Sequence, residues 1–212
     1  YWWDIVRFSI YYELRNTLVI KYSDQQVGMN QKNPILILKK IGKDIFYLFK
    51  SLFFKRKSLF FLCSRSKNNA DVNIDIIANK FLKVIPSNES FIIETVFDAN
   101  TEYSSYSNIF LIIIRKIKKL KLEKINFDIN RLLNSHFETS VDFYTIVQKC
   151  LHNYTLEYKN YIWLLRLVKP QYCFVIQNGI QKALFSAAKD LNIKCIELQH
   201  GQINNFHIAY SY

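Results

Sequence analysis

The side chains best suited to chemistry lie near the end of the sequence, where Gln199, His200 and Gly201 follow a short apolar run. A histidine titrates near neutral pH, so it can take a proton from a hydroxyl group or donate a hydrogen bond to a departing phosphate. Gly201 has no side chain and lets a ligand approach the main chain closely. His207 and Tyr210 follow in the same predicted loop. We predict that His200 is catalytic and that the other four residues bind substrate; the alternative is a hydrogen-bonded structural histidine.

The elements that must position His200 form a predicted βαβ unit. Residues 173–176 and 193–198 are short apolar runs, and the segment between them has the apolar spacing of a helix. In open parallel sheets, ligands bind beyond the carboxyl ends of the strands, and His200 follows such an end. Asn178 and Gly179 follow the first strand. They form a strand-to-helix turn, offer substrate-binding donors to an anion, or do both.

A third predicted strand also ends in polar side chains. The apolar run at 58–63 is followed by a polar loop at 64–69, which begins with Ser64 and Arg65. A hydroxyl and a guanidinium at a strand end can bind phosphate or sugar hydroxyls. We predict both as substrate-binding residues, with a solvated turn as the alternative.

The remaining elements alternate along the chain. Apolar runs predict strands at 58–63 and 91–96, and apolar periodicity predicts helices at 3–19, 34–53, 75–85, 127–136 and 141–167. The segment at 107–122 is predicted to be helical or mixed. Strands that alternate with helices are typical of a parallel sheet covered by helices. We therefore predict an α/β fold, with a Rossmann-like parallel sheet flanked by helices and with leading N-terminal helices. The predicted division is a basic, amphipathic helical segment at 1–57 and an incomplete Rossmann-like domain at 58–212.

The chain is strongly basic, with a net charge of +12 over 212 residues. This charge favours anionic partners, and the excess of lysine over arginine argues against base readout in a nucleic acid. The predicted helix at 34–53 has an apolar face and opposing lysines, so it either packs on its own domain or lies on an anionic membrane surface. The four cysteines show no metal or paired-cysteine spacing, which favours a reducing, cytoplasmic location. Membrane association would be peripheral, on the inner face of the cytoplasmic membrane.

Several kinds of site have no signature in the sequence. Neither the phosphate-binding loop nor the glycine-rich dinucleotide fingerprint is present, and there is no nucleophile elbow. Zinc-binding spacings are missing, and so is an Asp-x-Asp pair that holds a nucleotide-sugar through a cation. We therefore predict an activity that uses no metal and no cofactor.

The sequence from Ile196 to Gly201, with His207 and 210–212 behind it, resembles bacterial surface-polysaccharide transferases of the two-Rossmann-domain (GT-B) type. These include capsule and O-antigen glycosyltransferases and, more distantly, the polyol-phosphate polymerases of teichoic acid synthesis. The opening at 1–8 is similar to the aromatic, arginine-bearing helix at the start of some of these proteins. Gln202 departs from the teichoic pattern, which has a small hydroxyl residue there.

This resemblance implies one half of a GT-B architecture, the N-terminal and mainly acceptor-side domain. The nucleotide-sugar donor would be held mostly by a second domain beyond Tyr212, so we expect the fragment to be inactive alone. The implied activity is sugar transfer to a lipid-linked or growing surface polysaccharide, with His200 catalytic or in contact with phosphate. Polyol-phosphate transfer is one alternative. A non-catalytic basic module that binds nucleic acid or membrane is another.

Overall fold

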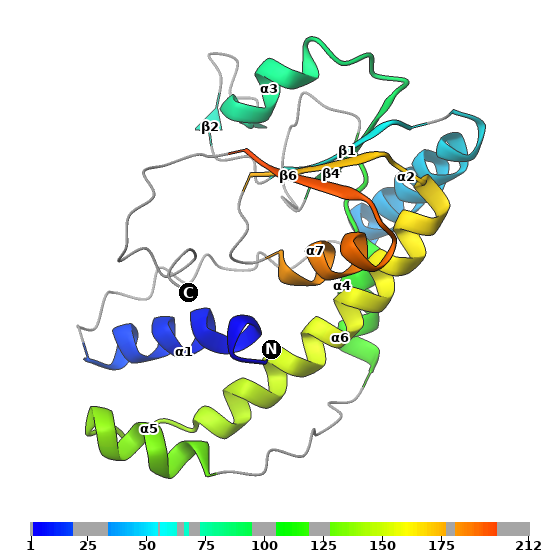
Figure 1. The fold of residues 1–212 in the computed structure, drawn as a ribbon. Helices are drawn as coiled ribbons and strands as arrows, with labels where there is room; N and C mark the ends of the chain where they lie inside the picture. Colours follow the sequence, from blue (N-terminus) through cyan, green and yellow to red (C-terminus); the bar gives the residue numbers. More distant parts are fainter. Residues whose placement is uncertain are drawn as a thin grey trace.

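The central element of the fold is a parallel sheet of four strands in the order β4-β1-β5-β6. The computed structural model describes residues 2–18, 34–54, 56–62, 66–67, 73–94, 105–118, 128–176 and 181–198. Helices cover the sheet (Figure 1), which confirms the predicted α/β class with a Rossmann-like parallel sheet. The strands of this sheet are β1 (Ser58–Leu62), β4 (Ser90–Glu94), β5 (Tyr172–Val175) and β6 (Lys194–Glu197).

Each strand of the sheet lies where an apolar run predicts one, within two residues at either end. One local prediction is partly wrong. Within the polar loop predicted at 64–69, the two residues of β2 (Ser66–Lys67) pair antiparallel with those of β3 (Asn73–Ile74). A pairing of two residues is too short to produce a hydrophobic alternation, so the sequence carries no periodic signal for it.

The helices also lie where periodicity predicts them. They are α1 (Trp2–Leu18), α2 (Pro34–Phe53), α3 (Ile76–Leu82), α4 (Ile109–Ile117), α5 (Ile129–Phe137), α6 (Phe143–Val168) and α7 (Lys182–Asp190). The third helix ends at Leu82, short of the predicted 85, and the chain continues in a turn whose Val84 and Ile85 amides donate to the Phe81 carbonyl. Its start is fixed by Asp75, whose carboxylate accepts from the Ile77 and Ala78 amides.

The two faces of the sheet bury alternate residues of each strand. From β1, Leu59 and Phe61 contribute to a core cluster with α6 and α7, whereas Phe60 and Leu62 contribute to a second cluster with α3. Figure 1 shows α3 on one side of the sheet and α7 with α6 on the other. Because β1 has a paired strand on each side and helices on both faces, all five of its residues are buried. This explains why its sequence is a continuous apolar run without alternation.

The outer edge of β4 is covered by groups from distant parts of the chain. Tyr106 donates its amide to the Ile92 carbonyl (2.8 Å) and accepts from the Glu94 amide (3.0 Å). The hydroxyl of Tyr47 accepts from the Ile92 amide at 3.2 Å. Arg56 Nη1 donates to the Ser90 carbonyl at 2.9 Å. The backbone groups that an edge strand leaves open are thereby satisfied within the fold.

The longest helix, α6, connects the sheet to α1 and α5. Its C-terminal half contributes Leu164 and Leu165 to the cluster beneath the sheet. Its N-terminal half buries Phe143 and Val147 in a third cluster, to which α1 contributes Val6 and α5 contributes Ile129 (Figure 1). α2 also contributes Tyr47 and Leu48 to the cluster beneath the sheet. The predicted division at residue 57 stays a prediction.

Two cysteines face each other across the β5–β6 pair. Cys173 and Cys195 are register partners, and Cys173 is fully buried in the core. Contact with the Cys195 thiol and burial both raise the pKa of Cys173. Both are free thiols, as is Cys150. Cys63 lies outside the described residues.

Candidate functional site

The carboxyl ends of the four strands lie along one edge of the sheet. Leu62 of β1 is in register with Glu94 of β4, and Val175 of β5 is in register with Glu197 of β6. The Leu198 amide donates to the Val175 carbonyl at 2.8 Å, which extends the β5–β6 alignment one residue beyond the strand. This carboxyl edge is where ligands bind in open parallel sheets.

The predicted site residues follow three of these strand ends and lie outside the described residues. They are Ser64 and Arg65 after β1, Asn178 and Gly179 after β5, and Gln199, His200, Gly201, His207 and Tyr210 after β6. β1 pairs with β5, and β5 pairs with β6. The residues after β1, β5 and β6 therefore follow the carboxyl ends of three adjacent strands. That much of the predicted arrangement follows from the strand order, while the contacts among the side chains stay a prediction.

Two cations come together where the chain returns from this edge into α7. Lys182 is the first residue of α7 and is half-buried. Burial lowers the pKa of Lys182, and the neighbouring Arg7 lowers it further, whereas Asp4 and Glu197 act in the opposite direction. Arg7 comes from α1, is 5% exposed, and lies 3.7 Å from the Asp4 carboxylate. Two cations, Arg7 and Lys182, and two carboxylates, Asp4 and Glu197, therefore form a charged cluster between the start of α1, the start of α7 and the end of β6.

A small cavity opens beside this charged cluster, with Lys182 in its lining. It has a volume of about 200 Å³ and is lined by Lys182 together with polar groups from α1 and α6, among them Ser9, Asn153 and Glu157. The N-terminus of α7 adds backbone amides with a positive dipole end. The N-cap residue Gln181 makes no side-chain hydrogen bond to these amides. The Lys182 ammonium and the amides at a helix N-terminus are groups of the kind that hold a phosphate or carboxylate.

We predict that replacing Lys182 with methionine stabilises the protein at neutral pH. The folded-state pKa of Lys182 lies below its unfolded value, so the unfolded chain binds more protons between the two values. Stability linked to Lys182 is present above the unfolded pKa of about 10.4 and is lost as the pH falls through the folded pKa. Methionine has no charge to bury, so the variant should not lose stability in this way as the pH falls. The melting temperature of both proteins, measured across pH, tests this.

The matched control is Lys189→Met at the other end of α7. Lys189 is exposed and lies in the last turn of the helix, where a cation interacts favourably with the dipole. We expect no stabilisation from this change. A lower melting temperature for Lys182→Met at every pH would show that the ammonium makes a net favourable contact in the folded protein.

The sequence reasoning missed Lys182, although a signal for it exists. Helices prefer acidic residues in the first turn, and a lysine in the first turn of a predicted helix opposes the dipole. Glu94 was also missed. It ends β4 at the carboxyl edge with 2% exposure, and the Ser105 hydroxyl donates to its carboxylate at 3.1 Å. Its signal is a carboxylate that directly follows a buried apolar run.

Two larger cavities lie away from the carboxyl edge. A groove of about 620 Å³ lies between α2, α4 and α6, and its lining is mainly apolar. A second cavity of about 380 Å³ lies beside β4, where Arg56 and Ser90 line it. We place the candidate chemistry at the carboxyl edge because the charged groups and the strand ends meet there. Among the described residues, no cluster of three or more potential metal-ligating side chains occurs.

Comparison of this chain with protein-family models, with curated proteins and with solved structures finds no match.

Proposed function

We propose that this chain is the N-terminal part of a glycosyltransferase. In this proposal it transfers a sugar from a nucleotide-sugar donor to a growing or lipid-linked saccharide acceptor in surface-polysaccharide synthesis. The observation that supports the proposal best is the half-buried Lys182 at the start of α7, with Arg7 as a neighbouring cation. The pair lies at the carboxyl edge of a parallel sheet, beside the strand that leads to His200.

The chemistry of sugar transfer matches the groups that this edge supplies. The bond between the anomeric carbon and the donor phosphate oxygen breaks, and a new bond forms between that carbon and an acceptor oxygen. The acceptor hydroxyl loses its proton to a general base, the role that we propose for His200. The nucleoside diphosphate leaves with additional negative charge. Arg7, Lys182 and the α7 amides can stabilise that charge, or the charge of a phosphate on the acceptor.

Polyol-phosphate transfer makes similar demands on an anion site, so the product distinguishes the two reactions. We propose an assay in which the full-length protein is incubated with membrane acceptor and either nucleotide-sugars or nucleotide-activated polyols. Each donor carries one label in the sugar or polyol and another in the phosphate attached to it. Sugar transfer moves only the sugar label into the polymer and releases labelled nucleoside diphosphate. Transfer of both labels would indicate phosphate-group transfer. Incorporation of neither label across a broad donor panel would contradict the proposal.

A further inference from the structure

The surface of α2 carries a large apolar area that the fold leaves uncovered. Six of its side chains are more than half exposed, from 53% for Ile45 to 71% for Phe53. We call this set the α2 apolar face; its members are Leu38, Ile45, Phe46, Phe49, Leu52 and Phe53. The sequence allows such a helix to pack its apolar side on its own domain. In this structure Ile45 and Phe49 lie on the exposed face, while Tyr47 and Leu48 reach the core.

The α2 apolar face continues into the groove of about 620 Å³. Ile45, Phe49 and Leu52 form its α2 wall, and Trp163 of α6 lies opposite with 49% of its surface exposed. Ile114 of α4 also lines the groove. Contiguous apolar surface of this kind marks a site of interaction with a protein or a membrane.

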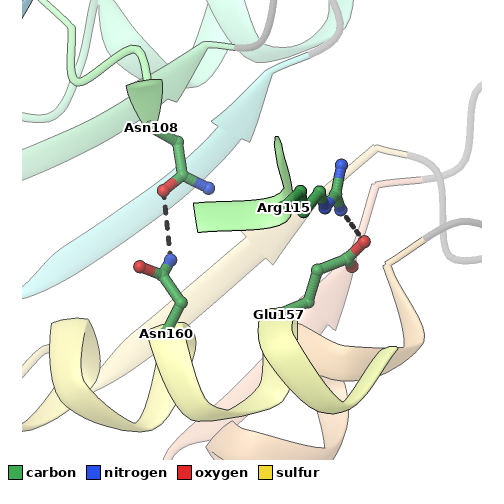
Figure 2. Close-up of polar contacts among 4 residues, drawn as sticks. All are labelled: Asn108, Arg115, Glu157 and Asn160. Atoms are coloured by element: carbon green, nitrogen blue, oxygen red, sulfur yellow. Dashed lines mark hydrogen bonds and ion pairs between the residues drawn. The ribbon is translucent and has the colours of Figure 1, made fainter. Parts of the chain in front are cut away.

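The α4 wall of the groove is fixed to α6 by polar contacts at both ends. Asn160 donates its side-chain amide to the Asn108 side-chain oxygen at 3.0 Å, and Arg115 forms an ion pair with Glu157 (Figure 2). Asn108 is the N-cap of α4 and has a left-handed backbone conformation, with a φ of 56°. These contacts hold α4 against α6, so the α4 and α6 walls of the groove are fixed relative to each other.

The charges around this surface identify its occupant. Lys39, Lys43 and Lys50 are exposed and alternate with Phe46 and Phe53 at helical spacing along one side of α2. Two further lysines, 118 and 159, line the groove.

The carboxylates near this surface are already engaged. Asp44 is the one acidic residue of α2; it is 1% exposed and accepts from the Ser107 amide and hydroxyl. Glu157 is paired with Arg115. Two copies of this surface would therefore bring like charges together, whereas an anionic surface would complement them.

We propose that the α2 apolar face and the adjoining groove dock the protein on an anionic lipid bilayer. α2 then lies in the membrane interface, with its aromatic side chains among the acyl chains and its lysines at the headgroups. Trp163 sits at the interface, where tryptophan is favoured in membrane-bound proteins. No helix among the described residues is long and apolar enough to cross a bilayer, so this docking is parallel to the surface. The inference does not depend on the chemistry proposed at the carboxyl edge.

The test is flotation of the protein with vesicles of neutral phosphatidylcholine, alone or with about one third phosphatidylglycerol. We expect binding to the anionic vesicles that weakens at high salt. Phe46→Gln combined with Phe53→Gln should lower the vesicle partition coefficient roughly 10-fold or more, given the apolar area that each ring would bury. Lys39→Gln combined with Lys43→Gln should lower it roughly fivefold per lysine on anionic vesicles only.

The matched control replaces two equally exposed apolar residues away from this surface, Val84→Gln and Leu132→Gln, and should bind as the wild type does. A second readout uses Trp163 as the single tryptophan in a Trp2→Phe, Trp3→Phe background. Its emission should shift to the blue and be quenched by brominated lipid.

Three results would overturn the proposal. The first is no binding to either vesicle type, and the second is binding that the Phe46 and Phe53 changes do not affect. The third is concentration-dependent dimerisation that these same changes abolish while vesicles have no effect, which would assign the face to a second copy. Because all the substituted side chains are exposed, far-UV circular dichroism should be unchanged. Loss of vesicle binding with intact sugar transfer to a water-soluble acceptor would separate this inference from the proposed function.

Discussion

Replacing His200 with alanine in the full-length protein is expected to slow sugar transfer roughly 100- to 10,000-fold, the usual contribution of a positioned general base. The expected effect depends on how the sheet holds the chain that leads to His200. β5 and β6 are in register, and the Leu198 amide donates to the Val175 carbonyl, so the chain is fixed at a point two residues before His200. The initial rate of sugar incorporation measures the effect. Circular dichroism and the melting temperature show whether the variant is folded.

Two further measurements distinguish a base from a phosphate contact. If His200 is the base, kcat/KM of the wild type should fall as the pH drops below the range where an imidazole titrates, and this limb should vanish in the variant. His200→Gln can still donate a hydrogen bond but cannot take a proton. If His200 is the base, this variant should therefore be as slow as His200→Ala. Near-normal rates in His200→Gln would assign a phosphate contact. His136→Ala, which removes an exposed histidine on α5, is the control.

Replacing Phe61 with alanine is expected to lower the free energy of unfolding by about 3–5 kcal/mol, the usual cost of removing a buried phenyl ring. Phe61 is 1% exposed in β1, between β4 and β5, and its ring lies edge-to-face with Tyr161 of α6 at a centroid distance of 6.4 Å. The ring therefore links the middle of the sheet to the helix that supports it. Urea unfolding measures the change.

The matched control is Phe53→Ala, which removes the same side chain from a position that is 71% exposed. We expect it to change the free energy of unfolding by no more than about 0.5 kcal/mol. An equal loss for both variants would mean that the sheet–α6 contact does not carry the stability assigned to it. The same Phe53 variant should weaken vesicle binding, so one substitution separates stability from docking.

Sequence periodicity was sufficient to place the strands of the sheet and the helices, because most of them bury one face or both faces. β1 illustrates this, since its fully buried residues appear as an unbroken apolar run. The packing of α2 was not predictable in the same way. Amphipathic spacing shows that a helix has an apolar side, but not whether the domain has room to cover it. In this fold Tyr47 and Leu48 pack in the core cluster beneath the sheet, whereas Ile45 and Phe49 stay exposed.

For the candidate site, the ends of the strands could be predicted because each strand is a short local apolar run. The roles of the residues that follow these ends stay predictions. The meeting of Arg7 with Lys182 could not be predicted, because it depends on α1 packing against α6 from the opposite end of the chain. The lysine in the first turn of the helix marks Lys182 as unusual, but not that the fold half-buries it beside Arg7.

The two outermost strands of the sheet, β4 and β6, are not equivalent. On β4, the contacts with Tyr106, Tyr47 and Arg56 occupy the backbone groups that another strand would need. β6 lies at the other end of the strand order, and its Ile196 side chain is 38% exposed. A strand added to the sheet by a partner or by a misfolded neighbour is therefore expected to join beside β6 rather than β4, next to the chain that leads to His200.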